Sequence, residues 1–276
     1  MTDAYRLPDG PVAIQFSGGR TSGYMLWHIL DYYDGALPPN CHVLFQNTGR
    51  EMPETLDFVA ECSQRWGVPI TWLEYGQDEP GYAVVGHNSA SRNGEPFAAL
   101  IRHRGYLPNR VTRYCTTELK IRPSIRFITN ALGWSQYTAV LGIRADEKHR
   151  AKDNKKERYS TIWPLIDAGV TKRNVVEWWA GHAFDLRIPA DNYKTSLGNC
   201  DGCFQKSERN RAWLARYRPD LAQWWDDIES EIGGTFAQRS SWRELMRLAE
   251  AQGDWVHGLD ENGSVLCTTG LGGCYD

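Results

Sequence analysis

Ser17-Gly18-Gly19-Arg20-Thr21-Ser22 is the stretch of sequence that decides the fold, because it separates an apolar run from a helical pattern. The run Val12–Phe16 before it is typical of a short buried strand, and Gly23–Leu30 after it predicts a helix. Glycines allow a tight turn, and the N–H groups and dipole at a helix start favour an anion. The serine and threonine hydroxyls add donors for phosphate oxygens. Taken alone, the hexapeptide also fits an ordinary turn after a strand.

Strand and helix patterns continue to alternate after this turn. Apolar runs typical of buried strands cover 41–47, 70–74 and 137–143, and helical patterns cover 54–66, 121–132 and 170–182. Such alternation predicts an α/β fold, in which a parallel sheet is flanked by helices. Ligands of such sheets bind at the carboxyl ends of the strands, which is where the glycine turn lies.

The other segments differ in character. Residues 76–112 predict a long, partly irregular insertion, and the charged run 144–158 predicts a loop. Helical patterns cover 209–232 and 241–252, and 254–265 is typical of a small hairpin. We therefore expect residues 1–195 to form the α/β domain and residues 196–276 to form a smaller, mainly helical region.

Composition restricts the class of protein further. The chain has 276 residues, a formal net charge of −3 and 41% hydrophobic residues, which fits a globular protein better than a general nucleic-acid binder. Without a run long enough for a membrane span or a signal-peptide pattern, we expect a cytoplasmic protein and no membrane partner. In that reducing compartment, seven cysteines with a CxxC among them indicate metal or sulfur chemistry rather than disulfides.

Five motifs in order along the chain point to one family. They are the glycine turn, Asn47-Thr48-Gly49 with Glu54-Thr55-Leu56, the segment Arg113–Pro123 with Cys115 and Lys120, Gly142-Ile143-Arg144 with Glu147 and Arg150, and Trp163-Pro164-Leu165. Together they resemble the PP-loop ATP pyrophosphatase superfamily, and within it the branch similar to phosphoadenosine-phosphosulfate (PAPS) reductases. The resemblance covers about residues 14–179 and implies an adenine nucleotide alpha hydrolase-like fold.

The resemblance implies a site for ATP with Mg²⁺. It implies nucleotide contacts from Ser17, Gly18, Gly19, Arg20, Thr21, Ser22, Asn47, Thr48, Gly49, Gly142 and Arg144. It also implies catalytic roles for Ser17, Lys120, Arg144 and Arg150 in cleavage between the α- and β-phosphates, since cations must spread the developing charge. Arg20 is the least secure member, because its side chain could point outward. The lysines of 144–158 are expected to be solvated.

Three cysteines belong to a second site. Cys200 and Cys203 form the CxxC, which alone fits a redox pair, half of a zinc site or part of an iron–sulfur site. Cys115 lies in a motif that carries a Cys-Cys pair for a [4Fe–4S] cluster in adenylylsulfate reductases, and Thr116 stands where the second cysteine would be. The resemblance implies three cluster ligands and leaves the fourth position to another group or to sulfide, as in cluster-dependent tRNA thiolases. Zinc is the alternative metal.

The remaining cysteines are assigned by their position. Cys274 stands near the terminus, as a reactive cysteine does in sulfate-activating reductases. A nucleophile, a fourth metal ligand and an ordinary tail residue all stay open for it, and Cys267 is another candidate fourth ligand. Cys41 and Cys62 lie on apolar faces and are expected to be buried structural thiols.

A basic stretch leaves the second substrate open. Residues 102–126 carry seven Lys or Arg residues against one acid, Glu118, with Tyr106 and Tyr114 between them. Such a stretch fits a nucleic-acid backbone, more nucleotide phosphate, or pairing with acidic helices elsewhere.

The function expected from these sites is that of an ATP pyrophosphatase that adenylates a substrate for sulfur transfer through an iron–sulfur cluster. The acceptor could be a nucleic acid, as in DNA phosphorothioation systems, and the donor a protein such as a cysteine desulfurase. Two alternatives stay open. One is an adenylylsulfate or PAPS reductase with Cys274 as nucleophile, and the other is a nucleotide- and cluster-binding module without turnover.

Overall fold

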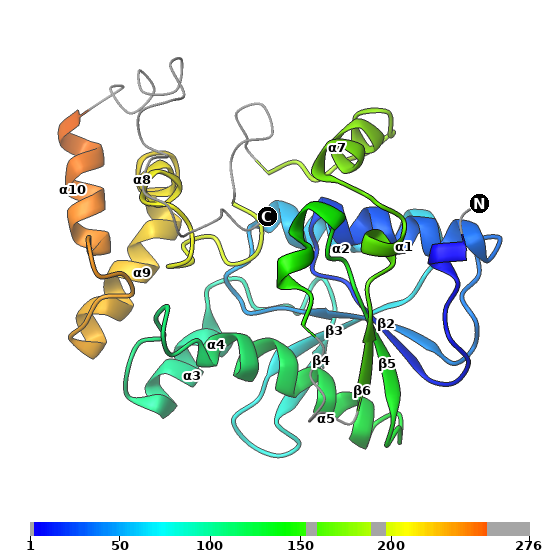
Figure 1. Cartoon of the computed structure of the whole chain (residues 1–276). Helices are drawn as coiled ribbons and strands as arrows, with labels where there is room; N and C mark the ends of the chain where they lie inside the picture. Colours follow the sequence, from blue (N-terminus) through cyan, green and yellow to red (C-terminus); the bar gives the residue numbers. More distant parts are fainter. Residues whose placement is uncertain (1–2, 153–158, 189–196, 253–276) are drawn as a thin grey trace.

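A six-stranded sheet is the centre of the computed structural model, which describes residues 3–152, 159–188 and 197–252 (Figure 1). The strand order is β4-β3-β2-β1-β5-β6, and β4 is the antiparallel edge strand. The bounds are β1 Val12–Gln15, β2 Cys41–Gln46, β3 Ile70–Tyr75, β4 Tyr82–Val85, β5 Tyr137–Leu141 and β6 Tyr159–Ile162. The expected α/β fold with a parallel sheet is thus confirmed.

Helices cover both faces of this sheet, and three more lie beside it (Figure 1). The α-helices are α1 Arg20–Tyr32, α2 Pro53–Trp66, α3 Glu95–Arg104, α4 Tyr114–Thr116, α5 Arg122–Asn130, α6 Pro164–Asp167, α7 Lys172–Ala180, α8 Glu208–Tyr217, α9 Pro219–Ile232 and α10 Trp242–Gln252. Short 3₁₀ turns occupy η1 (Asp3–Tyr5) and η3 (Ala145–Arg150), and a turn of π-helix, η2 (Thr117–Ile121), joins α4 to α5. Among these helices none is long and apolar enough to cross a membrane.

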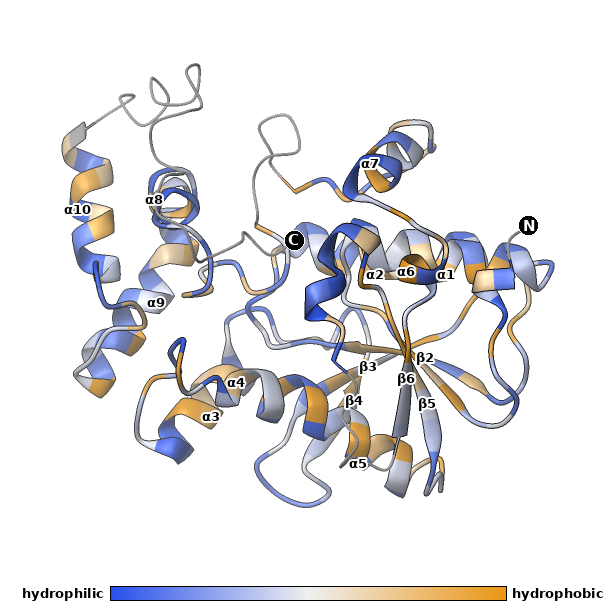
Figure 2. Ribbon diagram, viewed as in Figure 1, coloured by the Kyte–Doolittle hydropathy of each residue, from blue (hydrophilic) through white to orange (hydrophobic). Residues whose placement is uncertain are grey.

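The core follows from the alternation of side chains along the strands. Val12 and Ile14 of β1 pack on the face covered by α1 and α2, whereas Ala13 lies on the opposite face with Phe127 and Ile128 of α5. Because both faces are covered, the consecutive apolar residues Val43, Leu44 and Phe45 of β2 are all buried. Figure 2 shows that helices such as α10, by contrast, carry both hydrophobic and hydrophilic residues.

The topology places the ends of β1 and β5 at the sheet's switch point. The chain runs from β1 outward to β2 and β3, then returns to add β5 on the other side of β1. The connections after β1 and β5 therefore leave the sheet in opposite directions, and open α/β sheets in general bind their ligands at such a point. The glycine turn and Gly142–Arg144 both lie there.

The helices α8, α9 and α10 pack on one another beside the sheet (Figure 1). They attach to the α/β part through Trp224 and Trp225 of α9, whose rings lie 5.8 Å and 5.7 Å from that of Phe97 in α3. Trp225 is completely buried, which fits the expectation of a packing role for these tryptophans. The expected boundary at 195/196 and the expected hairpin at 254–265 lie outside the described residues.

Three expectations for local structure need correction. The insertion 76–112 contains β4 and α3 and is more regular than its composition indicates. The supposed loop 144–158 begins with η3, which is held because Ala145 donates a backbone hydrogen bond to Val170. The helical pattern 209–232 is two helices, because Pro219 cannot continue a helix and begins α9 instead.

Candidate functional site

The glycine turn forms a compact loop that opens onto the start of α1. Gly18 has φ +74°, and a Cβ there would lie 2.7 Å from Thr55 Cγ2, so only glycine fits. Gly19 is the N-cap of α1 and, lacking a side chain, leaves the first-turn N–H groups without the usual side-chain cap. Backbone donors at a helix start are the groups that bind phosphate in such loops.

The two serines of the turn have different positions. Ser22 is buried, accepts a hydrogen bond from Ser17 N at 3.2 Å and donates to Gly19 O at 2.9 Å, so its hydroxyl closes the loop from inside. Ser17 is exposed, with its hydroxyl 3.0 Å from that of Ser22. Ser17 is therefore the serine placed to meet a ligand.

The connection after β5 contacts this turn directly. A Cβ on Gly142 would lie 3.4 Å from Ser22 Cα, so the two backbones are neighbours. Arg144 is buried and donates to Thr21 Oγ1 at 3.1 Å and to Asp146 Oδ1 at 3.0 Å. The structure thus brings Gly142 and Arg144 to the glycine turn, although Arg144 and Thr21 lie 123 residues apart in the sequence.

The other expected cations are already paired. Glu147, an acid in the same motif, lies 3.3 Å from Arg144 and also pairs with Arg150. Arg20 points away from the turn, because its guanidinium forms a bidentate pair with Asp185 at 2.6 and 2.8 Å. A phosphate contact from Arg20 would therefore come from its backbone.

The motif after β2 is buried. The Asn47 amide donates to Glu74 at 2.6 Å and to Ser91 O at 2.8 Å, and it accepts from Gly49 N. Thr48 donates through both its N–H and its hydroxyl to Glu51 Oε2 at 2.8 Å. These side chains shape the loop, and nucleotide contacts from 47–49 stay a prediction.

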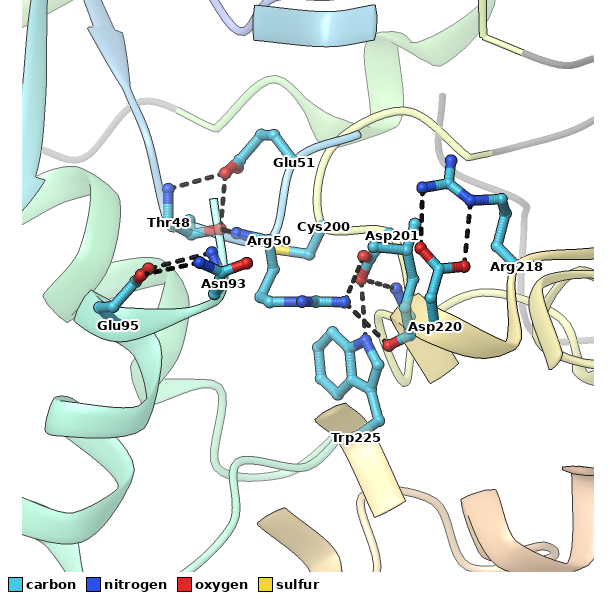
Figure 3. Close-up of polar contacts among 12 residues, drawn as sticks. Thr48, Arg50, Glu51, Asn93, Glu95, Cys200, Asp201, Arg218, Asp220 and Trp225 are labelled. Carbon is cyan, nitrogen blue, oxygen red and sulfur yellow. Dashed lines mark hydrogen bonds and ion pairs between the residues drawn. The ribbon is translucent and has the colours of Figure 1, made fainter. Parts of the chain in front are cut away.

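The CxxC loop is fastened to this motif (Figure 3). Glu51 and Cys200 form an antiparallel β-bridge, and Asp201 N donates to Arg50 O at 2.7 Å. The Arg50 guanidinium pairs with Asp201 at 2.5 Å, where both side chains are at most 3% exposed. Trp225 Nε1 donates to the other Asp201 oxygen at 2.8 Å. The helical part thereby holds the CxxC against the carboxyl end of β2.

The charge of Lys120 interacts with all three expected ligand thiols. Lys120 lies in the π-helical turn directly after Cys115, and its Nζ is 3.7 Å from Glu51 Oε1. Burial alone lowers the pKa of Lys120, but its attraction to Cys200, Glu51, Cys203 and Cys115 in their ionised forms outweighs this effect and leaves the pKa raised. Lys120 thus lies with the thiols.

Burial also keeps two of the thiols protonated in the free protein. It raises the pKa of Cys115 to about 11, and Cys203 adds to this shift. It raises the pKa of Cys200 as well, where Glu51 acts in the same direction and Lys120 opposes it. A metal would therefore have to displace protons on binding.

A metal centre on the three thiols stays a prediction. Glu51 Oε1, 3.7 Å from Lys120 Nζ, is buried and has no hydrogen-bond partner among the described residues. Within residues 3–152, 159–188 and 197–252, no group of three or more Cys, His, Asp or Glu side chains is arranged so that it could hold a metal ion. Cys267 and Cys274 lie outside the described residues. Cys62 is buried and Cys41 half-buried.

Part of the basic stretch pairs with acids. Arg102 pairs with Glu231 of α9 at 2.7 Å, and Arg104 and Arg122 both pair with Glu118. The Arg102 contact agrees with the third alternative, pairing with an acidic helix elsewhere, whereas Glu118 is the acid within the basic stretch itself.

Several site residues carried no sequence signal. In the sequence, Glu51 is indistinguishable from any acidic residue near the start of a helix. Arg50 and Asp201 are 151 residues apart and meet only because the fold pairs their segments. Gln15, Gln46 and Ser124 form a hydrogen-bonded trio at the ends of β1 and β2, with Gln46 donating at 3.0 Å to both partners.

Relatives share much of this chain. It is 34% identical over 242 residues to the uncharacterized nin region protein ORF290 of Escherichia phage lambda, covering 84% of this chain and 79% of that protein. It is 24% identical over 258 residues to the uncharacterized protein MJ0066 of Methanocaldococcus jannaschii, covering 88% of this chain and 48% of that protein. The chain thus spans about half the length of the second relative.

Two solved structures are similar to this chain, but at low sequence identity. The phosphate complex of phosphoadenylyl-sulfate (PAPS) reductase from Candida auris has a TM-score of 0.41 and 16% identity, over 65% of this chain and 75% of that chain. The U34-tRNA thiolase NcsA from Methanococcus maripaludis, with its [4Fe-4S] cluster, has a TM-score of 0.37 and 13% identity, over 100% of this chain and 79% of that chain. At these scores neither carries an inference about function.

The family itself is established by sequence. Residues 11–182, which include both the glycine turn and the Arg144 motif, match the phosphoadenosine phosphosulfate reductase domain. This match confirms the resemblance found in the motifs, and the chain belongs to the phosphoadenosine phosphosulfate reductase domain family.

Proposed function

We propose that this protein is an ATP pyrophosphatase that adenylates an acceptor for sulfur transfer. The observation that supports the proposal is that the two segments with the predicted sites lie at the carboxyl ends of two neighbouring strands. The glycine turn follows β1, and the CxxC is paired to the loop after its neighbour β2, with Cys200 Sγ 3.3 Å from Thr48 Oγ1. An activated acceptor would then form beside the thiols.

In the first half-reaction, an acceptor oxygen attacks the α-phosphorus of ATP and pyrophosphate leaves. The N–H groups of Gly19–Ser22 and the Ser17 hydroxyl would hold phosphate oxygens, with Mg²⁺ bound to the nucleotide. Arg144, fixed against Thr21, would stabilise the charge that develops on the leaving group, and Arg150 would support it through their shared Glu147.

In the second half-reaction, sulfide would bond to the acceptor atom that carries the adenylylated oxygen, and that oxygen would leave as part of AMP, so the step needs a sulfur source. Cys115, Cys200 and Cys203 would hold an iron–sulfur cluster, which when bound would supply sulfide; zinc is the alternative metal. A cysteine desulfurase is a suitable donor, and a nucleic acid is a candidate acceptor. Lys120 would balance the negative charge of the thiolates.

An ATP assay tests the first half-reaction. The protein, purified without oxygen, should release pyrophosphate from ATP, and it should form AMP where water takes the place of the acceptor at the α-phosphorus. Ser17→Ala and Arg144→Gln should each reduce this rate, Arg144→Gln by about 100-fold, because a preorganised charge contact is lost. Arg173→Gln is the matched control, since Arg173 is an exposed arginine of α7. Equal rates for Arg144→Gln and Arg173→Gln would contradict the proposal.

The same preparation separates the alternatives. Iron and acid-labile sulfide with a brown colour indicate a cluster, whereas a colourless protein with stoichiometric zinc indicates the other metal. Reduction of a sulfonucleotide that is lost in Cys274→Ala, without ATP cleavage, would support the reductase. No turnover in any form would support a binding module.

A further inference from the structure

Two arginines in the loop between α3 and α4 have no acid partner among the described residues. The other basic residues of the stretch 102–126 are already held, and their contacts are Arg102 with Glu231, Arg104 and Arg122 with Glu118, Lys120 with Glu51, and Arg126 with Gly81 O. Arg110 and Arg113 remain. Both are exposed, and neither forms an ion pair with any acid of the described residues. Their positive charge is therefore available to an anion.

The loop that carries these arginines closes on itself at Asn109. The side-chain oxygen of Asn109 accepts from the N–H groups of Val111 and Thr112 at 2.9 Å, and Asn109 N donates to Thr112 O at 3.2 Å. The turn uses no arginine side chain, and it leaves Val111 88% exposed. From residue 105 to residue 117 the sequence contains no Asp or Glu. The loop thus presents two cations on an exposed turn without an acid of its own.

Arg113 connects this loop to the segment that contains the CxxC. The Gln205 amide, turned so that its oxygen faces Arg113, accepts from Nε and Nη2 of the guanidinium at 3.1 Å. A neutral amide fixes the direction of the guanidinium without cancelling its charge. Gln205 stands two residues after Cys203, and Arg113 stands two residues before Cys115. An anion bound at Arg113 would therefore lie against the segments that carry the expected thiols.

An exposed aromatic ring stands at the start of the same loop. Tyr106 is 44% exposed, and the centre of its ring lies 5.1 Å from that of Tyr114, with the ring planes at 74°. The Tyr114 hydroxyl donates to Tyr106 O, and the Arg104 guanidinium lies over the Tyr114 ring at 5.6 Å. These contacts hold Tyr106 in place while much of its surface stays open to solvent. Unpaired bases stack on tyrosine rings exposed in this way.

We propose that Tyr106, Arg110 and Arg113 bind a single-stranded segment of nucleic acid, which is the acceptor of the proposed sulfur transfer. The role as acceptor rests on the proposed function, whereas the binding does not. Arginines on an exposed turn suit the successive phosphates of an extended backbone, and a neighbouring tyrosine suits an unpaired base. A single nucleotide is instead held by donors that converge on its phosphates, as those at the start of α1 do.

Fluorescence anisotropy tests this binding with the full-length chain. Short labelled single strands of RNA and of DNA are titrated with protein at several NaCl concentrations, and the strand that binds more tightly is used for the variants. Arg110→Gln and Arg113→Gln should each weaken binding and reduce the slope of log K against log salt by about 0.7, the value for one phosphate contact on a single strand. Tyr106→Leu should weaken binding about fivefold or more without changing the slope, because it removes stacking but no charge.

Arg102→Gln is the matched control for the loss of charge. It removes the same charge from the same basic stretch, but from an arginine that pairs with Glu231, so its binding and its salt slope should match the wild type. Equal losses in Arg102→Gln, Arg110→Gln and Arg113→Gln would show a general effect of charge and overturn the inference. A wild type that binds neither strand, or that binds a duplex of the same sequence as tightly, would also overturn it. Displacement of the strand by ATP with Mg²⁺ would assign the arginines to the nucleotide instead.

Pyrophosphate release from ATP, measured without any oligonucleotide, reports the proposed function by itself. If the wild type releases pyrophosphate but binds no strand, the nucleic-acid surface is wrong and the proposed function stands. If the strand binds as described but ATP is never cleaved, the surface stands and the proposed function fails.

Discussion

Single residues of the glycine turn show how strictly its shape is set. Gly18 must adopt a positive φ and also lie against Thr55, Phe45 and Val59, where a Cβ would come within 2.7 to 3.1 Å. The contact is with the helix and strand that follow, so the turn is fixed by the β2–α2 unit as well as by its own sequence.

Gly18→Ala should therefore destabilise the protein by more than backbone strain alone. Gly105 has a similar φ of +72°, and a Cβ there would meet no atom of the described residues within 4 Å, which makes Gly105→Ala the matched control. We expect about 1–2 kcal/mol of strain in the control and about 1–3 kcal/mol more in Gly18→Ala from overpacking. Urea denaturation measures both. Equal losses would show that the turn can relax.

At the scale of elements, α1 is held by α7 through aromatic side chains. His28 of α1 lies among the rings of Tyr5, Tyr24, Trp27 and Trp178, at centroid distances of 4.2 to 5.9 Å. Its Nε2 is buried and has no hydrogen-bond partner in the described part of the chain. This packing fits the structural role expected for His28 and fixes the helix that follows the glycine turn.

The packing of α1 on α7 should weaken in acid. Burial lowers the pKa of His28, while Asp31 opposes the shift and His182 adds to it. In the unfolded chain the histidine has a pKa of about 6.5, so as the pH falls it takes up a proton before His28 of the folded protein does. The stability that is present above that pH is therefore lost as the pH falls through the lowered pKa of His28 in the folded protein. His28→Gln should lose less stability than the wild type between pH 7.5 and 5 in urea denaturation.

An exposed histidine provides the comparison. His103, in the last turn of α3, is exposed, so His103→Gln should follow the pH dependence of the wild type. If the free energy of unfolding of His28→Gln changed with pH in the same way as that of the wild type and of His103→Gln, protonation of His28 would not destabilise the folded protein.

At the scale of the whole molecule, one buried ion pair connects the helical part to the sheet. Arg50 reaches from the end of β2 to Asp201 and donates to Leu221 O at 2.9 Å in α9, while its guanidinium lies 4.7 Å from the centre of the Trp224 ring. The arrangement of α8–α10 and the position of the CxxC therefore depend on the same contact.

Arg50→Met should loosen this connection. Removal of one partner leaves the Asp201 charge buried and unpaired, which costs about 3–5 kcal/mol. The double variant Arg50→Met/Asp201→Asn removes that charge and should recover part of the loss, because the amide oxygen can still accept from Trp225. Urea denaturation gives the free energies, and hydrogen exchange in α9 reports the connection. A double variant less stable than the single one would contradict this account.

The sequence by itself determined the α/β fold, the family and the order of the motifs. These follow from local patterns. The period of apolar residues separates strands from helices, and the glycine turn between β1 and α1 can be recognised from the residues on either side of it. It also singled out Cys115, Cys200 and Cys203 by residue type and spacing, while their metal stays a prediction.

Only the tertiary structure decided which residues meet. Arg20 pairs with Asp185, Arg144 and Arg150 share Glu147, and Glu51 lies beside Cys200. Each contact joins side chains whose direction is set by packing, and two of them join segments more than 145 residues apart, so no local pattern contains them. Glu51 Oε1 is the clearest case, because its burial and its lack of a hydrogen-bond partner among the described residues are properties of the folded chain alone.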